Sequence, residues 1–307
     1  KETLTGNGTA KVRHQAQTRT PNMAPPSQAA TGKRKKQHKP TKSLAVKSTN
    51  PVSKKTHKQK KPRPPAEQDQ TNAVAAAGEP AGGGVLLSAA LPPARQLEFL
   101  LRSFERAAKM RLSPLELGAY SEACMVQLAE GASQDVESFG DHVKGAFGAM
   151  WKGELCEGRL VEGSIDAGSP ALLVISLGAL RSLDLLRGLK MFTRGCRSVK
   201  LFAKHMKAEE QVALLKDRVN IACGTPSRIK KLIDMEALSL SRLKLVVLDM
   251  QRDPKSFNLF TLPQVSNEFW DLYKGYLDEK VRGGDTRICF YGAVSEKDAN
   301  KVLTPAE

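Results

Sequence analysis

The stretch VNIACGTPSRIKKLIDMEALSLSRLKLVVLDMQRD, from Val219 to Asp253, predicts a strand, a turn, a helix, a loop and a second strand. Apolar residues alternate over its first positions in a β-prone run, at Val219, Ile221 and Cys223. Gly224 ends this run, and Thr225 with Pro226 favours the start of a helix. A Thr hydroxyl can accept an unpaired backbone N–H at a helix N-terminus, and Pro fits the first helical position. We therefore expect the helix to begin at this dipeptide.

The helix and the second strand of this stretch both carry apolar residues where a core needs them. One face of the helix has the spacing i, i+3, i+4, at Ile229, Leu232 and Ile233. The run from Leu243 to Leu248 is apolar on both faces of a strand, which is typical of parallel sheets covered by helices on both sides. Asp249 follows this run, so we expect it at the carboxyl end of a strand, where open α/β sheets bind ligands.

Strand and helix patterns alternate on both sides of this stretch. Strands are predicted over residues 171–176, 199–203 and 287–291, and helices over 178–190, 208–217 and 269–276. The first of these helices is expected to direct four leucines toward the core, Leu180, Leu183, Leu186 and Leu189. Upstream, helices are predicted from Leu97 to about Met110 and from Ser113 to about Glu130, whereas residues 131–169 are weakly patterned. These patterns predict one α/β domain over residues 96–307, with a parallel sheet flanked by helices.

Residues 1–95 differ in composition from the rest of the chain. Residues 1–70 carry 17 Lys and Arg against 3 Asp and Glu, whereas residues 71–307 carry 31 against 29. The first 90 residues contain no Trp, Tyr or Phe, so they cannot bury enough apolar surface to offset the conformational entropy lost on folding. We therefore predict a disordered basic tail and linker over residues 1–95. Because the chain begins at Lys1, we also expect an upstream segment.

Two basic clusters occur within this tail. The first consists of Lys33, Arg34, Lys35 and Lys36 with Lys39, and the second of Lys54, Lys55, Lys58, Lys60 and Lys61 with Arg63. One interpretation is an arm that binds nucleic-acid phosphates or serves as a nuclear or nucleolar address. The other is a solvated segment that only keeps the protein soluble. If about eight of these charges contacted phosphates, log affinity would fall with log salt at a slope of about −7.

Several classes of function lack their sequence signals. The five cysteines are scattered without a C-x-x-C pair, which favours buried thiols over a zinc site, and the histidines have no neighbouring nucleophile pattern. The longest apolar run, Ala171 to Leu180, is about half the length that spans a bilayer. No G-x-x-x-x-G-K-S/T phosphate loop occurs in the sequence. The Gly-Lys pair that superficially resembles it, Gly32-Lys33, lies in the tail and is followed by Arg34 instead of Ser or Thr. We predict no catalytic residues, metal, cofactor, small-molecule substrate or membrane contact.

The second half of the chain resembles the first RecA-like domain of the DEAD-box RNA helicases, whose fold is that of the P-loop NTPases. The run ALLVISLGALRSLDLL resembles the strand and helix with the first RNA-contacting block. VKLFAKH lies where the helicases have a strand followed by paired glycines. The segment Thr225-Pro226-Ser227-Arg228 matches their Thr-Pro-Gly-Arg block except at Ser227. VVLDMQRD stands where Asp-Glu-Ala-Asp belongs, and CFYGA where Ser-Ala-Thr follows.

A closer resemblance is to the Cms-one family, nucleolar proteins of the early small-subunit pre-ribosome that share this degenerate helicase-like domain. The run VKLFAKHMKAEEQVALLKDRVNIACGTPSRIKKLI is similar to that family throughout, and the similarity is best over residues 170–253. It implies a non-enzymatic ribosome biogenesis factor in the nucleolus, with pre-rRNA and protein subunits of the 90S particle as partners. The alternatives are an ATP-dependent RNA helicase with an unconventional nucleotide site, and a DNA-binding protein that acts through the tail alone.

The groups that the helicases use for ATP hydrolysis are incomplete in this sequence. Such a site needs a phosphate cradle, an Asp that holds Mg²⁺ and a carboxylate that orients the attacking water. By resemblance Asp249 stands at the Mg²⁺-holding position, but Met250 replaces the Glu, and a thioether cannot orient a water. We favour the interpretation of Asp249 as a polar residue that ends a buried strand.

The Thr-Pro-Ser-Arg block supplies the candidates for RNA contact within the domain. In the helicases, the Thr and Arg of this block help to hold RNA phosphates, aided by the helix N-terminus that they begin. The resemblance therefore makes Thr225 and Arg228 candidates, with Lys230 and Lys231 as neighbours. The alternative is that Thr225 only caps the helix and Arg228 is an ordinary surface residue.

Overall fold

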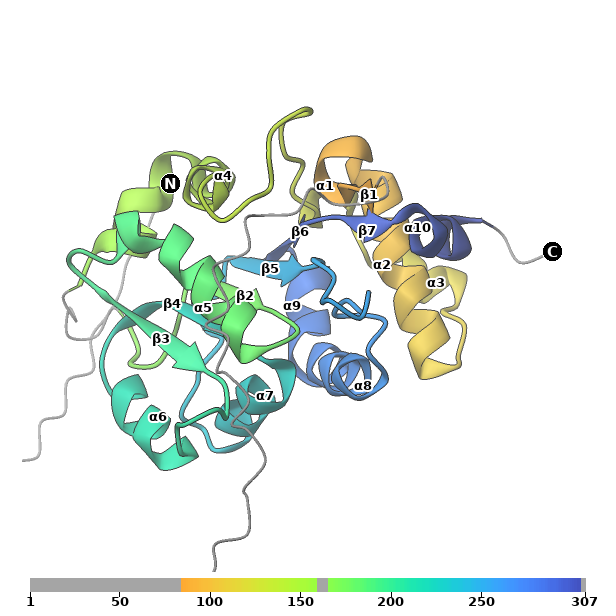
Figure 1. Ribbon diagram of the computed structural model, residues 1–307. Helices are drawn as coiled ribbons and strands as arrows, with labels where there is room; N and C mark the ends of the chain where they lie inside the picture. The colour runs from red at the N-terminus through yellow and green to blue at the C-terminus, as the bar shows by residue number, and fades with distance from the viewer. Residues whose placement is uncertain (1–83, 159–164, 305–307) are drawn as a thin grey trace, which may run out of the picture. The chain divides into compact units, whose positions relative to one another are not determined.

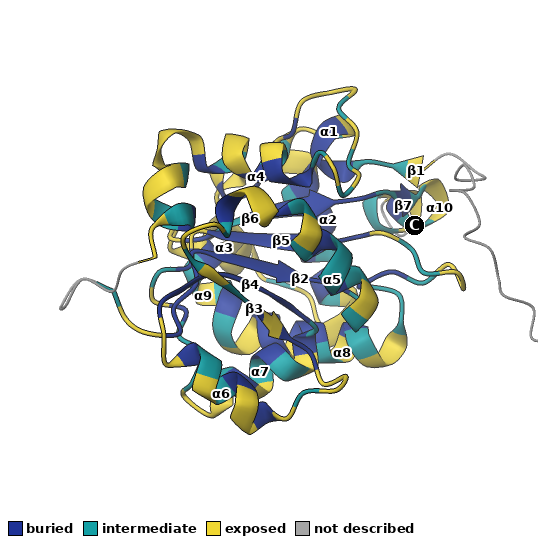
Figure 2. Ribbon diagram, turned by 60° about the vertical axis from the view of Figure 1, so that its left-hand side comes forward, coloured by how far each residue is buried: buried dark blue, intermediate teal, exposed yellow. Residues whose placement is uncertain are grey.

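A five-stranded parallel sheet in the order β3–β4–β2–β5–β6 forms the centre of the fold (Figure 1). The computed structural model describes residues 84–158 and 165–304. The strands of the sheet are β2 (Leu172–Ile175), β3 (Arg197–Leu201), β4 (Val219–Gly224), β5 (Leu245–Asp249) and β6 (Arg287–Tyr291). Every residue of β2, β4 and β5 is buried, because helices cover both faces of the sheet (Figure 2). The predicted α/β, RecA-like fold class is confirmed.

Helices precede, connect and follow the strands. The α-helices are α1 (Leu87–Ala90), α2 (Pro93–Ala108), α3 (Pro114–Gly118), α4 (Phe139–Phe147), α5 (Ala179–Gly188), α6 (Ala208–Leu215), α7 (Pro226–Asp234), α8 (Pro263–Leu272), α9 (Asp278–Arg282) and α10 (Glu296–Leu303). Short 3₁₀ or π turns are η1 (Glu122–Cys124), η2 (Gly148–Met150), η3 (Lys152–Cys156), η4 (Lys190–Phe192) and η5 (Tyr273–Leu277). Two further strands, β1 (Gly84–Val85) and β7 (Val294–Ser295), pair antiparallel beside the main sheet. Within the described residues, no helix is long and apolar enough to cross a membrane.

The two faces of the sheet bury separate apolar layers. Leu173 and Val246 belong to the layer with α2, α7 and α8, whereas their neighbours Leu172 and Val247 belong to the layer with α4 and α5. This difference follows from the strand geometry, since successive side chains of a strand point to opposite faces. Both faces are therefore closed by helices, which leaves the carboxyl edge of the sheet and the loops that leave it as the place for a site.

The sequence predictions upstream of residue 170 are only partly met. Ser113 caps α3 in the expected way, since its side chain accepts the Glu116 N–H while Glu116 binds back to the Ser113 N–H. The predicted continuation of this helix to Glu130 is wrong, because α3 ends at Gly118. The weakly patterned region contains α4, whose apolar face the sequence analysis did not recognise. The first elements, β1 and α1, also lie within the stretch assigned to the linker.

One parallel contact extends the sheet beyond β6. Met125 forms a bridge with Ile288, and the backbone N–H of Val126 donates to the Ile288 carbonyl at 2.8 Å. Residues 127–138, which we call the 127–138 loop, then lead into α4. This segment has the strand–loop–helix order of a phosphate-binding loop, but its sequence, QLAEGASQDVES, has one Gly and no Lys. The sequence of the 127–138 loop therefore does not match the G-x-x-x-x-G-K-S/T pattern.

Candidate nucleic-acid interface

The junction of β4 and α7 has the predicted backbone but lacks one predicted hydrogen bond. Thr225 is the N-cap residue of α7 and Pro226 its first residue, as expected. The Thr225 side chain makes no cap hydrogen bond, so the prediction that its hydroxyl caps the helix is wrong. Its backbone N–H instead donates to the Leu201 carbonyl at 3.0 Å, at the end of β3. The junction is thus tied to the neighbouring strand through the main chain.

Gly224 makes this tie possible. A Cβ at this position would overlap the Leu201 carbonyl oxygen and the Leu201 Cβ, because β3 and β4 approach closely at their carboxyl ends. On its other side, the Gly224 carbonyl accepts the Ser176 N–H at 3.0 Å. Gly224 is therefore required by the close approach of the backbones, and it fixes Thr225 at the edge of the sheet.

Arg228 points partly into the protein. Its Nη1 donates to the Met206 carbonyl at 3.1 Å and to Gln211 Oε1 at 2.6 Å. Gln211 is buried, and its Nε2 donates to the Lys200 and Phe202 carbonyls around the end of β3. Arg228 therefore holds the connection between β3 and α6 in place, which is a structural role that the sequence did not predict. Contact between its other nitrogens and RNA stays a prediction.

The two lysines of α7 have different surroundings. Lys230 Nζ lies 2.8 Å from Asp234 Oδ2 and 5.7 Å from the centre of the Tyr276 ring, so it is directed toward η5. Lys231 is exposed, and so is Ser227, which stands where the helicase block has Gly. Lys231 is therefore the lysine that is better placed to meet a ligand. The basic clusters of the tail, from Lys33 to Lys61, lie outside the described residues.

His205, in the turn that follows β3, has a φ of 61°, which is in the left-handed region. Glycine adopts this region without steric cost, whereas most other residues do not. His205 lies in the segment that resembles the helicase block with paired glycines.

Asp249 is the most deeply buried acid at the carboxyl edge, and it forms an ion pair. Its side chain is 0% exposed, and Arg181 of α5 reaches both of its oxygens. Arg181 Nε lies 3.1 Å from each oxygen, and Nη2 lies 2.9 Å from Oδ1. This arrangement is bidentate, the geometry in which Arg and a carboxylate bind best. The carboxylate is therefore held on both oxygens by a protein cation.

Two effects act on the Asp249 carboxyl in opposite directions. Burial raises its pKa above the usual 3.8, because a charged group is disfavoured away from water, while the Arg181 guanidinium opposes that rise. The sequence patterns did not identify Arg181 as the partner of Asp249. They do not give the order of the strands in the sheet, so they could not place β2 beside β5. The only available signal was an Arg in the first turn of the helix after a buried strand.

The space beside Asp249 is occupied by protein groups. Met250 is fully buried, and its N–H donates to the Tyr291 carbonyl at 2.7 Å. The 127–138 loop binds the end of β6, since the Tyr291 hydroxyl donates to the Asp135 carbonyl at 2.6 Å and Gln134 Oε1 accepts the Gly292 N–H at 2.8 Å. Among the described residues, no three His, Cys, Asp or Glu side chains form a group that could hold a metal ion.

The fold and this edge together define a class, a RecA-like α/β domain in which a buried Arg–Asp ion pair lies at the carboxyl edge of the sheet. The family model described as "CMS1: U3-containing 90S pre-ribosomal complex subunit" matches residues 153–291. The predicted resemblance to the Cms-one family is therefore confirmed, and the match extends beyond residues 170–253 in both directions.

Individual relatives agree with this match. The Chaetomium thermophilum protein CMS1 is 43% identical over 131 residues, which cover 40% of this chain and 52% of that protein. Human protein CMSS1 is 40% identical over 106 residues, covering 34% of this chain and 38% of that protein. Xenopus laevis protein CMSS1 is 38% identical over 122 residues, covering 39% and 44%. The chain thus spans about half, or less, of the length of these curated relatives.

Two solved structures are also similar to this chain. A DEAD box protein from the hyperthermophile Methanococcus jannaschii is 16% identical. The match covers 44% of this chain and 34% of that protein, with a TM-score of 0.29. The Saccharomyces cerevisiae protein Dbp5, bound to Nup159, Gle1, IP6 and ADP, is also 16% identical. The match covers 68% of this chain and 50% of the Dbp5 chain, with a TM-score of 0.32.

Proposed function

We propose that this chain is a non-enzymatic ribosome biogenesis factor of the small-subunit processome, the 90S pre-ribosome. It binds pre-rRNA and protein subunits of the early particle through its pseudo-helicase domain and its basic N-terminal arm. Its place of action is the nucleolus, within the nucleus. The match of residues 153–291 to a family described as a subunit of the 90S complex supports this function.

The observation that carries the non-enzymatic part of the proposal is the ion pair between Arg181 and Asp249. Hydrolysis of ATP requires a carboxylate that is free to hold Mg²⁺ and a second one that orients water. Here the first carboxylate is bound on both oxygens by a guanidinium, and Met250 occupies the position of the second. A scaffold, by contrast, needs only the fold and its surface.

In-cell RNA crosslinking with sequencing, together with sedimentation of cell extracts, tests the assembly role. We expect crosslinks to pre-rRNA at defined positions and co-sedimentation with early small-subunit particles. Diffuse crosslinks to many RNAs would support only phosphate binding by the tail. If crosslinking recovered no pre-rRNA and the chain did not co-sediment with early particles, the proposal would be wrong.

ATP turnover tests the enzymatic alternative separately. We expect the purified chain with RNA to show no ATP hydrolysis above background, and Asp249→Ala to leave that result unchanged. Turnover that is present in the parent chain and lost in Asp249→Ala would instead support an RNA helicase with an unconventional nucleotide site.

A further inference from the structure

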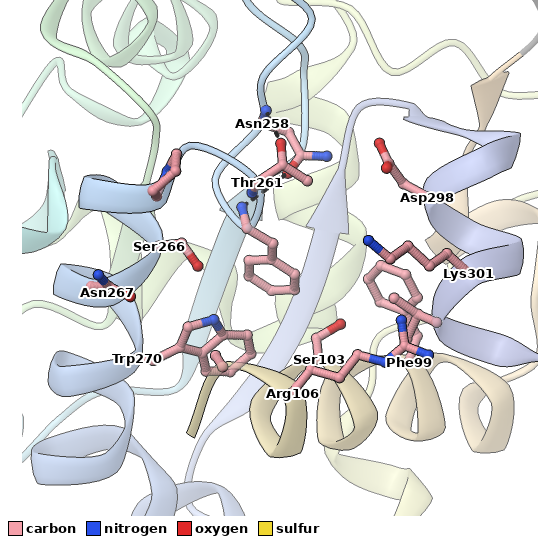
Figure 3. Close-up of a pocket in the computed structure, with 14 residues that line it drawn as sticks. Phe99, Ser103, Arg106, Asn258, Thr261, Ser266, Asn267, Trp270, Asp298 and Lys301 are labelled. Carbon is pink, nitrogen blue, oxygen red and sulfur yellow. Dashed lines mark hydrogen bonds between the residues drawn. The ribbon is translucent and has the colours of Figure 1, made fainter. Parts of the chain in front are cut away.

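A cavity of about 280 Å³ lies between α2, the loop that follows β5, α8 and α10 (Figure 3). Its floor is aromatic and consists of Phe99, Phe260 and Trp270. The Phe99 and Phe260 rings are stacked with centres 6.1 Å apart, and the centres of Phe260 and Trp270 are 4.8 Å apart. This cavity is separate from the ion pair at Asp249 and from the start of α7, since neither contributes to its walls.

One wall of the cavity holds a polar group without a partner. Ser103 of α2 is 8% exposed, and its hydroxyl makes no hydrogen bond. Figure 3 shows this hydroxyl directed from α2 toward the space in front of the aromatic floor. Buried hydroxyls are usually hydrogen-bonded, so an unpaired one that faces a cavity is available to a water or to a ligand with a polar edge. Asn258, by contrast, shapes the loop, since its Oδ1 accepts the Phe260 and Thr261 N–H groups.

The rim of the cavity is positively charged. Arg106 of α2 and Lys301 of α10 both line it and are exposed, and neither forms an ion pair within the described residues. The acid nearby, Asp298, is engaged with the hydroxyl of Ser295 at 2.7 Å. Figure 3 shows the Lys301 ammonium pointing from α10 toward the cavity. The rim therefore favours an anionic ligand.

The charge continues outside the cavity. A second hollow on the surface shares Arg106 and is lined in addition by Arg102, Lys109 and Arg111. Glu105 also lines it, but this acid accepts the Leu112 N–H at 2.7 Å. Arg102 is paired with Glu98, so Arg106, Lys109 and Arg111 supply the basic groups that lead from the end of α2 to the mouth of the aromatic cavity.

We infer that this cavity binds a single unstacked base of single-stranded RNA, with the adjoining phosphates on Arg106 and Lys301. The volume lies just below the range of sites for drug-sized molecules, so it suits one base. Aromatic rings supply the stacking surface, and the Ser103 hydroxyl supplies a hydrogen bond to a base edge. An apolar protein side chain would leave that hydroxyl unpaired and the two cations unused. The inference rests on the RNA binding proposed above and assigns it a site.

Trp270 provides a local signal for the test. The chain has two tryptophans, so full-length Trp151→Phe leaves Trp270 as the single tryptophan at the cavity. We expect a short single-stranded RNA of mixed sequence to quench its fluorescence in a saturable way, because a base would stack against the floor. Total binding is followed in parallel by anisotropy of the same RNA carrying a dye, which also reports contacts made by the tail.

Variants of the rim and the wall then locate the contact. In the Trp151→Phe chain, the pair Arg106→Glu and Lys301→Glu should weaken the quenching titration by about tenfold or more. Lys297→Glu makes the charge change of Lys301→Glu alone, on α10 but outside the cavity lining, and should change the quenching titration by less than about twofold. Ser103→Ala keeps the floor and the charge, so it should weaken quenching by a few fold while the salt dependence stays the same.

The outcomes separate this inference from the proposed function. RNA binding by anisotropy without any change at Trp270, or quenching that is unaffected by the double charge reversal, would overturn the cavity assignment alone. Quenching by an acidic peptide but not by RNA would overturn it as well and indicate a protein occupant. Loss of all RNA binding would overturn both the cavity assignment and the RNA contact of the proposed function.

Discussion

The carboxyl ends of β4 and β5 lie at the same edge of the sheet, separated only by β2, but they are held in different ways. At β5, Asp249 is bound by Arg181, and Met250 is buried beside it. At β4, Gly224 lies against β3 and Thr225 begins α7.

This difference shows two ways in which the end of a strand can be fixed. A buried carboxylate needs a partner of opposite charge, and an arginine on a neighbouring helix supplies it. A close approach of two strands has no such substitute, because only the absence of a side chain permits it. The end of β5 is therefore fixed by a charge pair, whereas the end of β4 is fixed by backbone contact.

Removal of the cation at β5 should produce the largest effect. In Arg181→Ala, Asp249 would be buried without its partner, and the free energy of unfolding should fall by about 3–5 kcal/mol. Because burial raises the Asp249 pKa, the native state of this variant binds a proton that the unfolded state has released. The loss of unfolding free energy in this variant should therefore grow as the pH rises above about 3.8 and become smaller in acid. Urea denaturation at several pH values measures both effects.

Two variants control this measurement. Arg187→Ala removes another arginine of α5, whose partner Asp184 is exposed, and should change stability by less than about 0.5–1 kcal/mol. Replacement of both members, Arg181→Met with Asp249→Leu, should recover most of the loss, since an apolar pair leaves no buried charge. A loss of under about 1 kcal/mol in Arg181→Ala would show that the pair is not the structural element described here.

The corresponding test at β4 adds a single methyl group to Gly224. Gly224→Ala would force the new Cβ against the backbone of Leu201, so we expect a loss of about 1–3 kcal/mol of unfolding free energy. The matched control is Gly178→Ala, since a Cβ there meets nothing within 4 Å. Equal stability of the two variants in urea denaturation would contradict the requirement for glycine at the β3–β4 approach.

The sequence predicted the second half of the fold well because its elements depend on local patterns. The β4 strand, the start of α7 at Pro226 and the fully buried β5 strand all follow from residues close together in the chain. The inward direction predicted for Leu180 is wrong, since this side chain is 65% exposed, while Leu185 is buried. The repeat of leucines at every third position drifts around a helix of 3.6 residues per turn, so it cannot stay on one face.

The candidate site depended more on contacts between distant segments, and the sequence predicted less of it. The partner of Asp249 lies 68 positions away in the chain, and it is brought there by a strand order that no local pattern contains. Likewise, the unpaired Ser103 and the aromatic floor come from α2, a loop and α8. Arg228 was singled out by its block, but its bond to Gln211 became visible only with the β3–α6 connection in place.

Arg228 itself can be tested for its structural role. Arg228→Ala removes two hydrogen bonds and leaves the buried Gln211 Oε1 without this donor, so we expect a loss of about 1–2 kcal/mol of unfolding free energy. Any fall in RNA crosslinking of this variant would then include an indirect effect through the β3–α6 connection. Unchanged stability would mean that the arginine is free to serve RNA alone.

The smallest effect expected is at Lys231, the exposed neighbour of a paired lysine. Lys231→Ala should leave stability within about 0.5 kcal/mol, since it lies on the surface. If Lys231 contacts an RNA phosphate, the slope of log affinity against log salt should become shallower by about 0.7. Lys230→Ala is the control, because its ammonium is already held by Asp234, and it should leave the slope unchanged. A slope that changes in neither variant would place the phosphate contact away from α7, whereas an equal change in both would show that the Lys230–Asp234 pair does not keep Lys230 from RNA.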